Sequence, residues 1–143
     1  MANHCYNELT ITGIPVSLQT LLDFVNSNGG VLDFNRIIPY PLEFNDVEEV
    51  DWRIEHWGTK WNATNPSLKW ENAGKIIFEF DTAWSPSIPI TVALSERYPD
   101  LVFVHHYDVS RMECRGTATI VNGEMIDHIK WKHSDFPDTD ENE

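Results

Sequence analysis

Alternation between hydrophobic and polar residues predicts β-strands in three parts of the chain. The segment CYNELTITG is typical of a half-buried strand, because one of its faces carries Cys5, Asn7, Leu9 and Ile11. The segment KIIFEFDTAW repeats this alternation, with Ile76, Phe78 and Phe80 on one face. The segment LVFVHHYDV is rich in β-branched and aromatic residues, which favour strands.

Two further segments are interpreted as strands from their turn residues. The segment CRGTATIVNGEMIDHIKW predicts a hairpin, because two alternating runs flank Asn122-Gly123, the pair that favours a type I′ turn. The segment VLDFNRIIPYP is interpreted as a short strand interrupted by Pro39 and Pro41.

Helical spacing predicts two helices outside the centre of the chain. The first follows Ser17 as N-cap, ends before Gly29-Gly30, and buries Leu18, Leu21, Leu22 and Val25. The second lies in SPSIPITVALSERYPD, ends at Pro99, and buries Ile90, Ala93 and Leu94.

A third, acidic helix is predicted in DVEEVDWRIEHWGTKWNA. Its apolar stripe consists of Val47, Val50, Ile54 and Trp57, and Gly58 is expected to end it. Trp61 would follow in a loop. Trp52 lies off this stripe, so we expect it on the exposed side of the helix among carboxylates.

This order of elements predicts an α+β protein with a ferredoxin-like sandwich, in which two helices cover one face of an antiparallel sheet. We expect one domain over residues 1–133, with a helical insertion around residues 45–74 and a C-terminal β-hairpin. Residues 134–143 are acidic, lack apolar periodicity and are expected to be disordered.

Net charge narrows the possible partners. The chain carries 10 basic and 23 acidic residues, for a net charge of −13, and 18 of the acidic residues precede the tail. Nonspecific nucleic-acid binding depends on Lys and Arg contacts to phosphate, so we expect a partner protein with a basic surface, with no direct nucleic acid and no membrane. Two cysteines, no secretory signal and no long apolar run fit a cytoplasmic protein.

Sequence motifs for catalysis or cofactors are absent. The sequence contains no GxSxG, P-loop, GxGxxG or HExxH, and two distant cysteines cannot hold an iron–sulfur cluster, so no cofactor is expected. A metal-dependent hydrolase remains an alternative, through Glu79 with Asp81 or through His56, His106 and Asp108. His105 and His106 are adjacent on a strand and should face opposite sides.

Several sequence blocks resemble the YubB ferredoxin-like family of plasmid and phage proteins. They are ANHCYNELTITG, IIPYP, WGTKWNA, FDTAWSPS and LSERYPDL, and they extend from Ala2 to about Gly123. The resemblance implies a ferredoxin-like fold and a mobile-element origin, but it implies no chemistry for any particular residue.

The first functional hypothesis is a non-enzymatic accessory protein that inhibits a host defence or nucleic-acid-handling complex, of the anti-CRISPR or anti-restriction type. Its acidic surface would compete with nucleic acid for a basic channel. The residues expected to bind the partner are Asp46, Glu48, Glu49, Asp51, Trp52, Glu55, Trp61 and Trp84. An undifferentiated structural role and a nucleic-acid-binding module that stacks bases on Tyr6 and Tyr107 are the alternatives.

Overall fold

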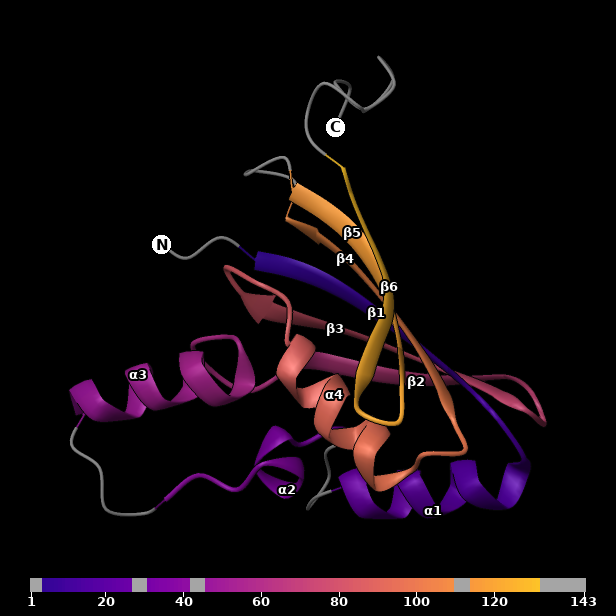
Figure 1. The fold of residues 1–143 in the computed structure, drawn as a ribbon. Helices are drawn as coiled ribbons and strands as arrows, with labels where there is room; N and C mark the ends of the chain where they lie inside the picture. The colour runs from indigo at the N-terminus through magenta and orange to yellow at the C-terminus, as the bar shows by residue number, and fades with distance from the viewer. Residues whose placement is uncertain (1–3, 27–30, 42–45, 110–113, 132–143) are drawn as a thin grey trace.

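A single six-stranded antiparallel sheet organises the protein (Figure 1). The computed structural model describes residues 4–26, 31–41, 46–109 and 114–131. The sheet order is β2-β3-β1-β4-β5-β6. The strands are β1 (His4–Thr12), β2 (Thr64–Asn72), β3 (Lys75–Ala83), β4 (Val102–Val109), β5 (Cys114–Val121) and β6 (Glu124–Trp131).

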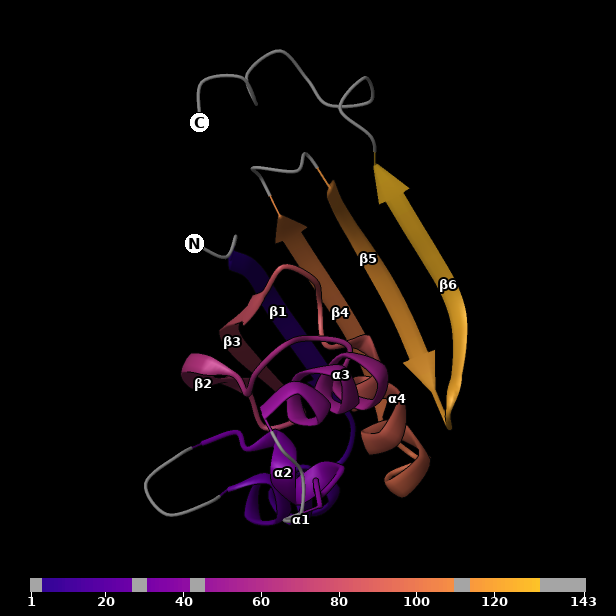
Figure 2. The same ribbon diagram turned by 90° about the vertical axis from the view of Figure 1, so that its left-hand side faces the viewer.

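In the part of the chain that the structure describes, four helices lie on one side of this sheet (Figures 1 and 2). They are α1 (Pro15–Val25), α2 (Phe34–Ile37), α3 (Asp46–Trp57) and α4 (Ile88–Arg97). Figure 2 shows that they cover one end of the sheet, and that β4, β5 and β6 extend beyond them. None of the helices in the described ranges is long and apolar enough to cross a membrane.

The connectivity confirms the predicted ferredoxin-like sandwich. The succession β1-α1-β2-β3-α4-β4 forms a split pair of β-α-β units, and its strands lie in the order β2-β3-β1-β4, each antiparallel to its neighbour. Helices α2 and α3 are inserted between α1 and β2. The predicted hairpin, β5 with β6, extends the sheet from β4, and Asn122 and Gly123 have the positive φ values of its turn.

The predicted strand in residues 31–41 was wrong. This segment forms the short helix α2, because the Asp33 carboxylate caps it by accepting the Asn35 backbone N–H at 3.0 Å. The second strand of the fold is β2, which the prediction had included in the helical insertion. As an edge strand β2 buries none of its residues, so its sequence carries no hydrophobic alternation.

The core lies between the sheet and the helices. The predicted inward faces of β1 and β3 are confirmed, since their alternate residues are buried. Helix α1 buries the predicted residues but begins at Pro15 after Ile14 as N-cap. Ser17, the predicted N-cap, lies within the helix, where its hydroxyl donates to the Asp100 carboxylate at 2.7 Å.

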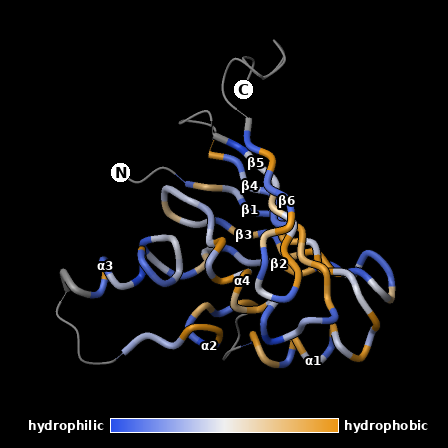
Figure 3. Tube along the Cα trace, in the orientation of Figure 1, coloured by the Kyte–Doolittle hydropathy of each residue, from blue (hydrophilic) through white to orange (hydrophobic). Residues whose placement is uncertain are grey.

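Helix α3 is placed as predicted but is rotated about its axis. It ends at Gly58, whose φ of +82° and N–H bonds to Arg53 and Ile54 carbonyls form the terminal turn. Trp57 is 2% exposed and its indole N–H donates to the Ile38 carbonyl at 2.8 Å, whereas Ile54 is 47% exposed. Figure 3 shows that α3 is mainly hydrophilic along its length, so its few core contacts, with the buried Trp57 foremost, fix its orientation.

Candidate functional site

The turn between β3 and α4 holds Trp84 in a strained backbone conformation. Trp84 has a φ of +72°, and the Ser85 backbone N–H donates to the Ala83 carbonyl at 2.8 Å across it. A hydrogen bond between residues i and i+2 across a central residue of positive φ defines the rare, strained form of the γ-turn. A bulky L-residue in this region costs roughly 1–3 kcal/mol, and such outliers concentrate at functional sites.

Side-chain hydroxyls attach this turn to the end of α3. The buried Thr59 hydroxyl donates to the Ala83 carbonyl at 2.8 Å and accepts the Ala83 N–H at 2.9 Å. The Ser85 hydroxyl donates to the Gly58 carbonyl at 2.5 Å, and the Thr82 hydroxyl donates to the Ser85 carbonyl at 2.7 Å. The surrounding structure therefore enforces the unfavourable conformation of the turn.

An open apolar pocket of about 280 Å³ lies beside the turn. We call it the Trp84 pocket, and it is lined by Ile54, Thr59, Lys60, Ala83, Trp84 and Ser85. Trp84 is 39% exposed, and the Lys60 ammonium nitrogen lies 5.8 Å from the centre of its ring. Trp84 therefore presents its ring to solvent from a rigid support.

Two of the predicted acidic residues lie on α3 near Ile54, the residue of this helix that lines the pocket. Asp51 and Glu55 are exposed and lie three residues before and one residue after Ile54 on α3, so the three side chains share one side of the helix. Glu49 instead accepts the Tyr40 hydroxyl at 3.0 Å. Asp46 and Glu48 are the other predicted acids; they begin α3, and their side chains lie outside the described part of the structure.

Trp52 is not the exposed anchor that was predicted. It packs against the core, stacks on His56 with ring centres 4.4 Å apart, and contacts Tyr40 and Trp57. The rotation of α3 explains this outcome, because it exchanges the expected positions of Trp52 and Ile54. Trp61 is 38% exposed and lines a different, more polar pocket of about 410 Å³.

A second acidic surface lies on the face of the sheet opposite the helices, which we call the open face. Strand register places Glu8 directly opposite Glu79, and Tyr6 opposite both Asp81 and Asp108. Directly opposed side chains have Cβ atoms about 4.5–5.5 Å apart, and like charges at that spacing are destabilising. The open face therefore places two carboxylates in directly opposed positions, and His106 is the other cross-strand neighbour of Glu8.

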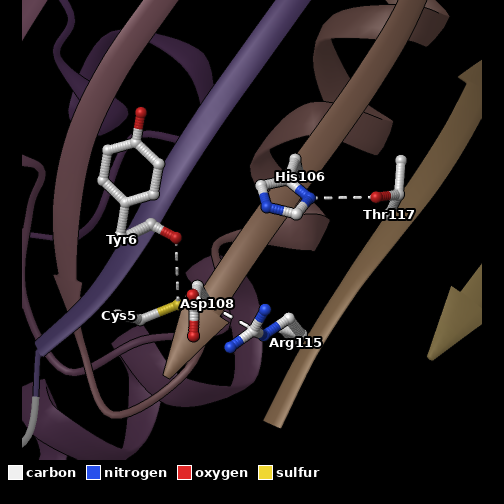
Figure 4. Close-up of polar contacts among 6 residues, drawn as sticks. All are labelled: Cys5, Tyr6, His106, Asp108, Arg115 and Thr117. Atoms are coloured by element: carbon white, nitrogen blue, oxygen red, sulfur yellow. Dashed lines mark hydrogen bonds and ion pairs between the residues drawn. The ribbon is translucent and has the colours of Figure 1, made fainter. Parts of the chain in front are cut away.

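Figure 4 shows polar contacts of neighbouring residues on the open face. Arg115 pairs with Asp108, with Nε 3.8 Å from Oδ2, and His106 contacts the Thr117 hydroxyl at 3.0 Å. The Tyr6 hydroxyl donates to Glu8 at 3.3 Å. Partial burial, followed by the charges of Glu79 and Glu8, raises the pKa of Tyr6 to about 12.

The expected alternative site at Tyr107 was wrong. Tyr107 is 3% exposed on the helix-covered face, where its hydroxyl contacts His128 Nε2 at 2.8 Å. Tyr6 is 36% exposed on the open face, but its strand partners are the carboxylates of Asp81 and Asp108. This pair of tyrosines cannot form one base-stacking platform.

A buried polar chain connects the core to the Trp84 turn. His105 Nε2 lies 2.7 Å from Asn7 Oδ1, and the Asn7 amide donates to the Thr82 hydroxyl at 2.9 Å. Because that amide is the donor, Asn7 Oδ1 accepts the His105 Nε2 proton, and Nδ1 accepts the Thr91 hydroxyl at 2.8 Å. Complete burial, with minor contributions from His106 and His128, lowers the pKa of His105 to about 3.

The residues suggested for a metal site do not come together. Within the described ranges, no three His, Cys, Asp or Glu side chains are arranged to hold a metal ion. His56 stacks on Trp52 beside α2 and α3, whereas His106 lies on the open face with Asp108. His105 and His106 face opposite sides of β4, as predicted.

The strand order and the two crossover helices define a ferredoxin-like α+β protein. The chain belongs to the family described as the ferredoxin-like domain in Api92-like protein, whose model matches residues 56–143. The crystal structure of the protein api92 from Yersinia pseudotuberculosis is similar to this chain, with a TM-score of 0.71 and 12% identity over 92% of this chain and 98% of that chain. At this identity the similarity shows a shared fold alone. No curated protein matches the chain.

Trp84 was singled out from the sequence as a candidate, but the residues that hold it were not. The blocks WGTKWNA and FDTAWSPS supply Thr59 and Ser85, and each hydroxyl bonds a backbone group of the other block, at Ala83 and Gly58 respectively. Both blocks belong to the set that resembles the YubB family, and this was the one feature of the sequence that could have linked them. The pairing of Glu8 with Glu79 carried no such signal, because alternation predicts the polar face of each strand but not which strands are neighbours.

Proposed function

We propose that this protein is a non-enzymatic accessory protein of a mobile element, which inhibits a host defence or nucleic-acid-handling complex by occupying a basic surface of that complex. The observation that carries the proposal is the direct opposition of Glu8 and Glu79 on the open face, which none of the described helices covers. Residues that violate a local stability rule without compensation are expected at functional sites. A partner's Lys and Arg side chains would relieve this repulsion.

The charge of the open face favours a protein partner over nucleic acid. Glu8, Glu79, Asp81 and Asp108 lie on three adjacent strands, and Arg115 neutralises Asp108 in part. Phosphate groups would be repelled from such a surface, whereas a nucleic-acid-binding channel of another protein would be attracted to it. Competition with nucleic acid for that channel follows from this complementarity.

The mobile-element part of the proposal is supported by the sequence blocks that resemble YubB proteins of plasmids and phages. A small protein that blocks a nucleic-acid-handling complex of its host fits that setting. Inhibition of the anti-CRISPR or anti-restriction type is the form that we propose.

Affinity capture followed by displacement tests the proposal. Wild-type protein is immobilised and exposed at low salt to a Yersinia pseudotuberculosis lysate, from the organism of the structurally similar protein. Each captured protein is purified, loaded with a fluorescent oligonucleotide, and titrated with wild type or the double variant Glu8→Gln/Glu79→Gln. Exposed ion pairs contribute roughly 0.2–1 kcal/mol each, so losing two should weaken displacement about two- to thirtyfold.

The control is a double variant with the same net charge, Asp23→Asn/Glu124→Gln, at exposed positions on α1 and β6. It should displace the oligonucleotide as well as wild type does. Equal displacement by both double variants, or an oligonucleotide that stays bound in the presence of wild type, would refute the proposal.

A further inference from the structure

The Trp84 pocket has three properties of an anchoring site for a partner side chain. Its walls at Ile54, Ala83 and Trp84 are apolar, and Ile54 and Trp84 are exposed to solvent. Its support is rigid, because hydroxyl groups of Thr59, Thr82 and Ser85 hold the turn. Anchors in protein interfaces are apolar side chains that enter preformed pockets, since a rigid pocket loses little entropy on binding.

The strain at Trp84 gives independent support for binding. Glycine and asparagine adopt a φ of +72° most readily, yet this position carries tryptophan, the largest of the side chains. The conformation projects the indole out of the turn, where it is 39% exposed. A tryptophan that only filled the core could do so from an ordinary backbone conformation with negative φ.

Charges around the pocket indicate which side chains should flank the anchor. Asp51 and Glu55 are exposed on the side of α3 that carries Ile54. Among the described residues neither carboxylate takes part in an ion pair. Lys60, whose ammonium group lies over the Trp84 ring, supplies one positive charge against these two negative ones.

We propose that the Trp84 pocket binds a branched aliphatic side chain of the partner protein, with a neighbouring arginine or lysine of that partner meeting Asp51 and Glu55. The pocket volume of about 280 Å³ accommodates one such side chain. This inference takes one element from the proposed function, namely that the partner protein has a basic surface. It adds an apolar contact at a surface distinct from the open face.

Peptide binding measured by NMR tests this inference without the natural partner. The probe is the peptide acetyl-Gly-Arg-Leu-Arg-Gly-amide, and the readout is the Trp84 indole N–H signal, identified by its loss in Trp84→Asn. Asparagine is chosen because it tolerates a positive φ, which protects the fold. The leucine peptide should shift this signal saturably at millimolar concentration.

Two altered peptides and one variant serve as controls. Replacing leucine by alanine, or both arginines by glutamates, should weaken binding at least fivefold. Trp70→Ala removes a tryptophan of matching exposure, 41%, from β2 and should leave binding of the leucine peptide unchanged. Binding should be lost in Ile54→Asn, which fills the exposed wall with a polar group.

Absence of a shift with the leucine peptide, or equal shifts with all three peptides, would overturn the inference. Its failure can be distinguished from failure of the proposed function. If the Glu8→Gln/Glu79→Gln variant still loses oligonucleotide displacement while no peptide binds, only the pocket assignment fails. If the peptide binds but displacement is unaffected, the pocket stands and the open-face proposal fails.

Discussion

Protonation of His105 should destabilise the folded protein, because its imidazole is fully buried and neutral. The pKa of His105 is lowered from 6.5 to about 3 in the folded state, so the unfolded chain binds a proton first as pH falls. The stabilisation that comes from keeping His105 neutral is therefore fully present above pH 6.5, and it is lost progressively as the pH falls from 6.5 towards 3. Each pH unit within that window corresponds to about 1.4 kcal/mol of unfolding free energy, so the loss between pH 7 and pH 4.5 is roughly 2–3 kcal/mol.

The variant His105→Gln isolates this contribution, since glutamine has no titrating group. Urea denaturation followed by tryptophan fluorescence at pH 7 and pH 4.5 gives the free energy of unfolding for both proteins. Wild type should lose roughly 2–3 kcal/mol more than His105→Gln over this interval, even if the variant is less stable throughout. Subtracting the two curves removes the titration of the many carboxylates, which both proteins share.

A destabilised control separates this effect from a general loss of stability. Leu94→Ala removes a fully buried side chain of α4 without removing an ionisable group. It should cost about 2–5 kcal/mol at both pH values and keep the wild-type difference between them. Parallel curves for wild type and His105→Gln would refute the view that the buried histidine is neutral.

Three further variants test the local arguments. Gly58→Ala should lower the free energy of unfolding by about 1–3 kcal/mol in urea denaturation, because φ is +82° and its Cβ would lie 2.6 Å from a proline of α4; an unchanged midpoint would contradict this. Glu8→Gln should raise that free energy by about 0.2–1 kcal/mol at low salt through relief of repulsion with Glu79, and the gain should shrink in 1 M salt. Gly116→Ala should lower the melting temperature, since its Cβ would lie 2.8 Å from the Ile129 carbonyl on β6. A wild-type melting temperature would show that β5 and β6 can separate without cost.

Sequence reasoning predicted the fold where burial leaves a periodic pattern. Strands β1, β3 and β4 show that pattern, because one face of each is buried under the helices. Strand β2 shows none, as it lies at the sheet edge with no buried residue. The segment at Phe34 was misread because a single helical turn, capped by Asp33, is too short to display helical periodicity.

The placement of the candidate site residues could be anticipated only in part, for similar reasons. Trp84 could be recognised from its position after a strand and before a proline-rich helix start. The orientation of Trp52 could not, because it depends on the hydrogen bond of Trp57 with the Ile38 carbonyl, a contact between separate helical segments. The opposition of Glu8 and Glu79 likewise depends on tertiary strand order.

Site-specific photo-crosslinking tests most directly whether the open face binds the partner. A photoreactive residue is placed at Thr10, which lies between Ile77 and Val104 on the open face, or at the exposed Gln19 of α1. The protein whose oligonucleotide is displaced should crosslink from Thr10 and not from Gln19, and high salt should abolish the product. Crosslinking from Gln19 alone, or equally from both positions, would contradict an acidic docking surface on this face of the sheet.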